Sequence, residues 1–269
     1  MTDPRALLDD LLELLVVPSF TRFGYLTRQR LFDWEPAESW SLAGRTVVIT
    51  GPTSGLGRET AGSLARMGAR LILLGRDLEK LERTAGELRT DSPPEAGNAI
   101  VVADMSSMSS VRIAADRILA TEPRSDIVID NAGAIFPSRE ETDDGFERTF
   151  ATMVAGPFVL VARLLPRLLE SPDPRLVAVT SGGQYTQSLP LQDLGYREGT
   201  YDGPRAYARA KRAQVALVRE WARRFHDQGL TANAMHPGWA DTPGLAASLP
   251  GFRELMGGAL RSAAEGADT

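Results

Sequence analysis

The feature that most constrains the fold of this chain is a regular alternation of short apolar segments with longer helical segments, from residue 44 to about residue 235. Short runs rich in valine, isoleucine and leucine alternate with stretches whose apolar residues recur at helical spacing, which is the pattern of βαβ units. Such units build a parallel sheet with helices on both faces. We therefore predict a doubly wound α/β fold, a Rossmann-type three-layer sandwich, whose ligand crevice lies at the carboxyl ends of the strands.

The predicted strands and helices follow one another in strict order along this part of the chain. The strands are expected at Arg45–Thr50, Arg70–Leu74, Ile100–Ala103, Ile127–Asp130, Leu176–Thr180 and Thr231–Met235. The helices are expected at Leu56–Met67, Asp77–Arg89, Val111–Leu119, Gly145–Leu169 and Ala206–Phe225. A chain of 269 residues suits one such domain, here residues 44–269, better than two small ones.

Residues 1–43 precede this domain and are predicted to form an amphipathic extension. Leucines recur at helical spacing between Leu7 and Leu15, with acidic residues on another face. The preferred interpretation is a helix that docks on the body or on a second subunit. The alternative is contact with a membrane surface, because aromatic residues and arginines interleave over residues 20–34, as in an interfacial anchor. The acidic face disfavours this alternative.

Composition excludes several functional classes. The chain has no cysteine and only two histidines, which excludes disulfides, thiolate catalysis and metal sites built from cysteine or from several histidines. We therefore expect no metal. The net charge of −5 argues against nucleic-acid binding, which needs a basic surface. The lack of cysteine fits a reducing compartment, and we expect a cytoplasmic location.

A glycine-rich turn lies directly between the first predicted strand and the first predicted helix. Its sequence is Thr50-Gly51-Pro52-Thr53-Ser54-Gly55-Leu56-Gly57. Gly51 permits a tight turn, while Gly55 and Gly57 let the backbone approach a phosphate and the helix approach the sheet. The N–H groups at a helix start and the positive end of its dipole attract anions. The alternative is that these glycines only form an ordinary βα turn. Their position between the first strand and the first helix favours a site for the pyrophosphate of a dinucleotide, which we therefore predict.

The end of the second predicted strand indicates which dinucleotide binds. NAD-binding proteins place an acid there to hold the ribose hydroxyls, whereas this strand ends in Leu74-Gly75-Arg76. The guanidinium of Arg76 can pair with a 2′-phosphate, which an acid would repel. The sequence therefore favours NADP(H) over NAD(H). Arg58 and Ser54 are candidates to assist, and Asp77 is expected to cap the following helix.

Tyr207 and Lys211 are separated by about one helical turn, so their side chains share a face and can reach a common ligand. A free phenol has a pKa near ~10. A neighbouring ammonium and a cationic nicotinamide would both lower that pKa toward the range of a useful proton donor. Such a pair is common by chance, but Ser181 follows the fifth predicted strand at the same sheet edge. Its hydroxyl could hold a substrate oxygen there.

Taken together, these segments resemble the short-chain dehydrogenase/reductase family from about Arg45 to Thr242. The matching segments, in the family's order and spacing, are Thr50–Gly57, Asp104, Asn131-Ala132-Gly133, Ser181, Tyr207, Lys211, Pro237-Gly238 and Thr242. Further segments resemble one subgroup of this family. They are Val179–Gly183, Tyr207–Arg212, His236–Gly244, Pro250–Phe252 and Glu265–Thr269.

This resemblance implies an NADP(H)-dependent oxidoreductase that interconverts a secondary alcohol and a carbonyl compound by hydride transfer. Tyr207 would be the general acid/base, Ser181 would orient the substrate oxygen, and Lys211 would hold the nicotinamide ribose. Asp104 would contact adenine, Asn131 would steady the sheet beside the cofactor, and Thr242 would meet the carboxamide. The full set of expected cofactor-binding residues is Gly51, Thr53, Ser54, Gly55, Leu56, Gly57, Arg76, Asp104, Met105, Asn131, Ala132, Gly133, Tyr207, Lys211, Pro237, Gly238 and Thr242.

The chain departs from the family pattern in three places. The family usually places an asparagine on the central helix, where it holds a water that returns a proton to the tyrosine, but here that position is Met153. A thioether donates no hydrogen bond, so this relay must be rerouted, slowed or absent. Asp130 replaces the first of a frequent asparagine pair, and we expect a minor structural effect. The family continues beyond the position of Thr269, so the end of the domain is expected to be incomplete or naturally short, with an exposed sheet edge.

These departures support a second hypothesis, a cofactor-binding sensor or scaffold with weak or no turnover. For the enzyme, two segments should flank the nicotinamide, residues 184–204 and 239–260. Their larger side chains are Gln184, Tyr185, Leu189, Tyr201, Trp239 and Phe252. They predict an aromatic pocket for a mid-sized lipophilic alcohol or carbonyl compound, unless they pack on the core. The resemblance also implies a homo-oligomer formed through the helices that carry Met153 and Tyr207.

Overall fold

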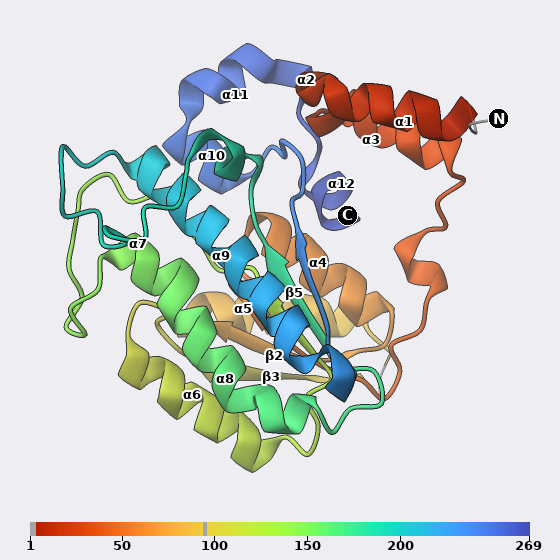
Figure 1. The fold of residues 1–269 in the computed structure, drawn as a ribbon. Coiled ribbons are helices and arrows are strands. Elements are labelled where there is room, and N and C mark those ends of the chain that lie inside the picture. Colours follow the sequence, from red (N-terminus) through yellow and green to blue (C-terminus); the bar gives the residue numbers. More distant parts are fainter. Residues whose placement is uncertain (1–3, 94–95) are drawn as a thin grey trace.

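The structure is a computed structural model that describes residues 4–93 and 96–269, so residues 1–3 of the predicted extension lie outside it. At its centre is a six-stranded sheet in the order β3-β2-β1-β4-β5-β6 (Figure 1). The strands are β1 (Thr46–Thr50), β2 (Arg70–Gly75), β3 (Asn98–Val102), β4 (Ile127–Asp130), β5 (Arg175–Val179) and β6 (Thr231–Met235). Every neighbouring pair is parallel, which confirms the predicted doubly wound fold class.

Helices cover both faces of the sheet. One face carries α6 (Met108–Thr121), α8 (Gly156–Leu168) and α9 (Gly203–Phe225). The other face carries α4 (Gly55–Arg66) and α5 (Leu78–Asp91). Val47 and Val48 are neighbours in β1, yet Val47 packs with α4 and α5 while Val48 packs with α6 and α8. Successive side chains of a strand point to opposite faces, so each short strand stabilises two cores.

The helix predicted at Gly145–Leu169 begins later than expected. Gly145 takes a φ of +78° in a turn, and the carboxylate of Glu147 then caps the first helical turn. From there α7 (Arg148–Phe150), a π-helical turn (Ala151–Ala155) and α8 form one helical segment. By length and composition alone, this segment is apolar enough to cross a membrane. In this fold it is a core helix, because the apolar side chains of α8 pack with those of α6 and the sheet.

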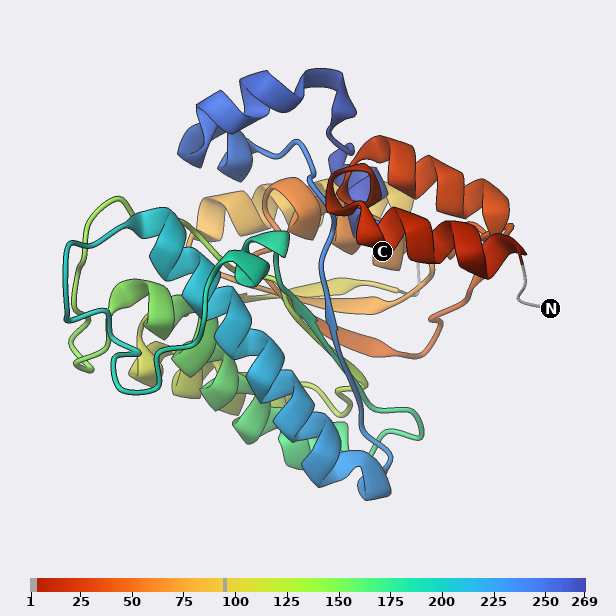
Figure 2. The same ribbon diagram turned by 45° about the horizontal axis from the view of Figure 1, so that its top comes forward.

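The N-terminal extension folds into α1 (Pro4–Leu14), α2 (Val16–Phe20) and α3 (Arg22–Leu31), and a 3-10 turn (Ala37–Ser39) leads to the sheet. These helices lie beside the C-terminal segment, which holds α10 (Pro243–Ser248), α11 (Pro250–Met256) and α12 (Ala263–Ala267) (Figures 1 and 2). Arg22 forms an ion pair with Glu265 at 2.8 Å. The phenol of Tyr25 donates a hydrogen bond to Asp268 at 2.7 Å. The extension therefore docks on the body of the same chain.

Docking buries only part of the apolar surface of the extension. Leu12, Phe20 and Tyr25 are buried, whereas Leu14 and Phe23 are exposed. The aromatic residues of segment 20–34 therefore do not act as one group: Phe20 and Tyr25 face the protein, and Phe23 faces outward.

The strand order positions the candidate site. The direction in which strands are added reverses between β1 and β4, and ligands of doubly wound sheets bind at the carboxyl ends of the strands flanking this switch point. At the far end of the sheet, β6 pairs with β5 and its residues are exposed or half-buried, so β6 is an edge strand within the described sheet.

Candidate active site

The turn after β1 brings its backbone close to the crevice and to the neighbouring elements. Gly51 and Gly55 take φ values of +66° and +52°, which favour glycine. At Gly57, an added Cβ would lie 2.2 Å from the carbonyl oxygen of Gly51, so α4 can start here only with glycine. Ser54 precedes α4, and within the described chain its side chain makes no capping hydrogen bond. The first N–H groups of α4 are thus left for an anion.

Asn131, the residue after β4, fastens this turn to the sheet. Its side-chain amide donates hydrogen bonds to the carbonyl oxygens of Thr50 and Gly51, at 2.9 and 3.0 Å. In return, the hydroxyl of Thr50 accepts from the backbone N–H groups of Asn131 and Ala132. Asn131 therefore occupies the supporting position that the sequence predicted for it, and Thr50 is a partner that the sequence did not reveal.

The ends of β2 and β3 bring Arg76 and Asp104 to the same crevice. Arg76 follows Gly75 at the end of β2 and is exposed. Asp77 caps α5 by accepting from the backbone N–H of Lys80 at 3.1 Å, which is its predicted role. Asp104 accepts hydrogen bonds from the backbone and hydroxyl of Ser106. Arg58 was expected to assist Arg76, but its guanidinium instead binds Glu87 at 2.8 and 3.1 Å.

Ser181, Tyr207 and Lys211 meet on the other side of the crevice. Lys211 is 2% exposed, its ammonium donates to the carbonyl oxygen of Val179 at 2.7 Å, and it lies 5.5 Å from the centre of the Tyr207 ring. The hydroxyl of Thr180 donates to the backbone carbonyl of Lys211 at 3.0 Å, which ties α9 to the end of β5. Ser181 caps the next 3-10 turn (Gly182–Thr186) by accepting from the backbone N–H of Gly183, and it lies close enough to Tyr207 to lower the pKa of the phenol.

The protein groups around Tyr207 do not lower its pKa in the way the sequence suggested. Burial raises the pKa of Tyr207, and the hydrogen bond with Ser181 offsets this only in part. Burial also lowers the pKa of Lys211 to about 8, although the negative charge of Asp130 opposes this shift. A Tyr207 pKa within the working range therefore requires a further positive charge beside the phenol.

Met153 fills the position at which the family pattern has asparagine. It is completely buried in the π-helical turn, among Val154, Ala210 and Ala213. Its sulfur lies 3.0 Å from the point where a Cβ on Gly133 would stand, and the ammonium of Lys211 lies 3.4 Å from the same point. A thioether thus packs where a hydrogen-bonding amide would lie, and it can hold a water only as a weak acceptor.

The loop after β6 closes the crevice above α4. Gly238 has a φ of +69°, and its backbone N–H donates to the Nδ1 of His236 at 3.0 Å. Thr242 caps α10, and its Cβ lies 3.3 Å from the point where a Cβ on Gly55 would stand. Thr242 therefore contacts the turn after β1, and His236 has the structural role expected for it.

All of these parts border one cavity of about 1700 Å³. It is lined by the loops that follow all six strands, and every residue predicted for catalysis or for cofactor binding contributes to it. Ligand pockets usually measure roughly 300–1,000 Å³, so this cavity has room for a dinucleotide and a second ligand together.

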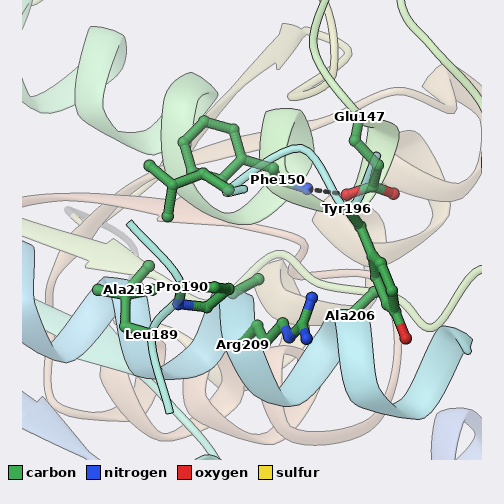
Figure 3. A pocket seen from close by; sticks show the side chains of 10 residues that line it. Glu147, Phe150, Leu189, Pro190, Tyr196, Ala206, Arg209 and Ala213 are labelled. Atoms are coloured by element: carbon green, nitrogen blue, oxygen red, sulfur yellow. Dashed lines mark hydrogen bonds between the residues drawn. The ribbon is translucent and has the colours of Figure 1, made fainter. Parts of the chain in front are cut away.

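Three of the residues predicted to define the substrate pocket lie elsewhere. Tyr185, Trp239 and Phe252 line the cavity, whereas Gln184, Leu189 and Tyr201 do not. Leu189 borders a separate hollow between Glu147, Phe150 of α7 and α9, which is too small for a substrate at about 10 Å³ (Figure 3). Tyr201 donates to Glu147 at 3.1 Å, and Gln184 is buried. These side chains stabilise the loops instead.

The sequence did not reveal the contribution of the two chain ends to the cavity. Phe20, Arg28 and Trp34 from the extension line it, together with Arg261 near the C-terminus. None of them belongs to a motif, and each reaches the cavity only through tertiary packing.

Comparison with known proteins decides the family. A family model described as short chain dehydrogenase matches residues 45–250. The chain belongs to the short-chain dehydrogenase/reductase family. Family members bind nicotinamide cofactors, which fits the turn after β1, and the oxidoreductase class follows from the family.

Curated relatives include dehydrogenase/reductase SDR family member 12 from Bos taurus, 36% identical over 253 residues that cover 93% of this short-chain dehydrogenase/reductase and 77% of the relative. This is the subgroup that the downstream segments resemble. Retinol dehydrogenase 13 from Homo sapiens is 36% identical, covering 75% of this chain and 61% of the relative.

Among solved structures, a Beutenbergia cavernae protein with bound NADP, provisionally named NAD(P)-dependent gluconate 5-dehydrogenase, is 26% identical with a TM-score of 0.68. The alignment covers 85% of this chain and 88% of that protein.

Proposed function

We propose that this protein is an NADP(H)-dependent oxidoreductase that interconverts a secondary alcohol and a carbonyl compound, with Tyr207 as general acid/base. One observation carries the proposal: Ser181, Tyr207 and Lys211 border the same cavity as the glycine-rich turn after β1. A protein that only bound a dinucleotide would have no need for a phenol, a hydroxyl and a buried ammonium at one point.

The residues at the crevice fit a dinucleotide. Gly57 leaves no room for a side chain, and the uncapped start of α4 offers N–H groups to a pyrophosphate. Asp104 is expected to contact the adenine. Gly133 lies close to the ammonium of Lys211, and Thr242 caps α10. The bound cofactor supplies or accepts the hydride.

The protein side of the reaction is proton transfer at one oxygen atom. In reduction, the phenol of Tyr207 donates its proton to the carbonyl oxygen, and Ser181 positions that oxygen by hydrogen bonding. In oxidation, the phenolate removes the hydroxyl proton. The positive charge of an oxidised nicotinamide would favour the phenolate, against the burial that raises the pKa of Tyr207.

The first test is reduction of a panel of carbonyl compounds with NADPH, followed by the loss of reduced-nicotinamide absorbance. We expect Tyr207→Phe to lower kcat by about 100-fold or more, because it removes the proton donor. Binding of NADPH to this variant should stay within a few fold of wild type. NADPH binding without turnover of any carbonyl would favour the alternative, a sensor or scaffold, for which Met153 in the place of the relay asparagine is the supporting observation.

The preference for NADP(H) is proposed from Arg76 and from the absence of an acid at the end of β2. Arg76→Ala should weaken NADPH binding by about 10- to 100-fold, the size of a charge-assisted hydrogen bond to phosphate, and leave NADH binding unchanged. Titration of cofactor fluorescence measures both. Arg112→Ala, on the outer side of α6 and away from the cavity, is the matched control. Equal NADPH and NADH affinities in the wild type would defeat the proposal.

A lipophilic substrate is proposed from the aromatic residues that line the cavity, Tyr185, Trp239 and Phe252. The name retinol dehydrogenase, which several relatives carry, denotes a lipophilic alcohol and supports this class. The homo-oligomer and the cytoplasmic location stay predictions from the sequence.

A further inference from the structure

Phe20, the last residue of α2, reaches the catalytic end of the cavity from outside the region that matches the family. Its ring is 9% exposed and packs on the loop after β5, where a Cβ on Gly182 would lie 2.7 Å from Cε2 of Phe20. Gly182 directly follows Ser181, the residue proposed to hold the substrate oxygen. Phe20 therefore lies next to the loop that carries Ser181, although it precedes the matched residues 45–250.

Phe20 is the centre of an aromatic group that we call the aromatic wall, and all of its members line the cavity. The ring of Phe20 lies 4.2 Å from His236 and 5.7 Å from Trp239, both edge to face, and 6.2 Å from Tyr185. Trp239 in turn meets Phe252 at 5.3 Å. The members of the aromatic wall are Phe20, Tyr185, His236, Trp239 and Phe252.

Backbone hydrogen bonds hold Phe20 in this place. The carbonyl oxygen of Phe20 accepts from the backbone N–H of Trp239 at 2.8 Å. The buried guanidinium of Arg261 donates to the carbonyl oxygens of Ser19 and Thr21 on one side and of Pro237 on the other. The residues before and after Phe20 are thereby tied to the loop after β6. A ring fixed in this way is preorganised for a ligand.

The aromatic wall carries no charge at neutral pH. Burial and the charge of Arg261 lower the pKa of His236 to about 4, so its imidazole is neutral, and its Nδ1 already accepts a hydrogen bond from Gly238. The cations nearby are engaged with other groups: Arg28 pairs with Asp9 and Glu13, and Arg261 binds backbone carbonyls. The surface therefore suits an uncharged, flat apolar group better than a charged one.

We infer that the N-terminal extension forms part of the substrate site, with Phe20 as a specificity-determining residue that stacks against an aromatic or conjugated group bonded to the reacting carbonyl carbon. This inference rests on the proposed function for the chemistry, but the recognition step can be measured without turnover. It assigns substrate recognition to residues 16–31, a role that a merely structural extension would not have.

The test compares the binding of acetophenone with that of 2-butanone, which has no ring. Calorimetry measures binding of each ketone to the full chain, with and without NADP⁺. NADP⁺ is the oxidised cofactor, so neither ketone is reduced during the measurement. Phe20→Ala should weaken acetophenone binding by about 10-fold or more and 2-butanone binding by less than about 3-fold, since only the aryl group loses its stacking partner. Phe20→Leu, which keeps most of the volume, should give a smaller loss with the same preference. Phe23→Ala, an exposed phenylalanine on α3, is the matched control and should change neither.

Equal weakening for both ketones, no weakening, or no acetophenone binding to the wild type would overturn the inference. Failure of the proposed function is a separate outcome: the wild type then fails to oxidise NADPH with any carbonyl compound, while the binding comparison still decides the role of Phe20. Where carbonyl reduction occurs, Phe20→Ala should raise KM for acetophenone more than it lowers kcat. Circular dichroism and NADPH binding confirm that the variants are folded.

Discussion

At the scale of single residues, two aspartates flank β4 and titrate in opposite directions. Burial alone would raise the pKa of Asp126, but hydrogen bonds from Arg124, Ser171 and the backbone of Thr46 hold it at about 2. Asp130, at the other end of the strand, accepts from Gln214 at 2.7 Å, and its second oxygen has no partner among the described residues. Burial raises the pKa of Asp130 to about 6, against the charge of Lys211. Asp126 accepts several hydrogen bonds, which outweigh the effect of burial on its pKa, whereas Asp130 lies deeper and accepts only the one from Gln214 among the described residues.

We predict that Asp130→Asn stabilises the protein near neutral pH. A carboxyl whose folded pKa is raised contributes stability below its unfolded pKa of about 4 that is lost as pH rises through about 6. Asparagine does not titrate, so the variant does not lose this stability as pH rises. Relative to wild type, its free energy of unfolding should therefore increase by on the order of 2 kcal/mol between pH 4 and 7. Loss of the attraction between Asp130 and Lys211 reduces this gain. Thermal unfolding across this pH range measures the difference.

Asp126→Asn is the control with the opposite sign. In the wild type, the folded pKa of Asp126 is lowered. The stability that its carboxylate contributes is therefore present above about pH 4 and is lost as pH falls toward 2. The variant should be destabilised at neutral pH and approach wild type in acid. Parallel pH curves for wild type and Asp130→Asn would contradict the role assigned to Asp130.

At the scale of elements, α4, the turn after β1 and the end of β4 form one packed unit. An added Cβ at Gly57 would meet both the carbonyl oxygen of Gly51 and, at 2.3 Å, the side-chain nitrogen of Asn131. That nitrogen donates to the carbonyl oxygens of the turn, so a side chain on α4 would displace the helix and the turn together. The packing of three elements thus sets the geometry of the anion site.

Gly57→Ala is therefore expected to weaken NADPH binding by at least about 10-fold, because the start of α4 must move away from the turn. Fluorescence titration measures this loss. Gly86→Ala, inside α5, is the control: an added Cβ there meets nothing within 4 Å, so cofactor binding should not change and the helix should gain stability. NADPH affinity in Gly57→Ala equal to wild type would show that the turn does not hold the pyrophosphate.

The same scale explains what sequence patterns could predict. The strands were placed within two residues of their observed starts, because short apolar runs bounded by turn residues are local signals. The start of the segment leading to α8 was wrong, because an apolar pattern does not show that Gly145 turns and Glu147 caps. Most of the predicted site residues line one cavity because they follow a strand, and parallel strands end at one sheet edge. Tyr207 and Lys211 reach the same edge from α9.

At the scale of the whole molecule, the place of Phe20 in the aromatic wall could not be predicted, although Tyr185, Trp239 and Phe252 were expected at the pocket. Phe20 meets residues more than 150 positions away, and neither spacing nor composition encodes such a contact. The sequence analysis assigned either docking or membrane contact to the extension as a whole. In the structure, some of its apolar side chains are buried against the protein and others are exposed. Of the loop residues expected at the substrate, Gln184, Leu189 and Tyr201 do not line the cavity. Tyr201 is held by a hydrogen bond to Glu147, Leu189 borders the small hollow beside Phe150, and Gln184 is buried.

The hydrogen bond from Arg261 to the carbonyl oxygen of Ser19 spans 242 positions in the chain. On the ribosome, β1 to β6 can be complete while Phe20 still lacks the guanidinium that fixes its neighbours. The contacts that fix the neighbours of Phe20 can therefore form only after Arg261 has emerged from the exit tunnel.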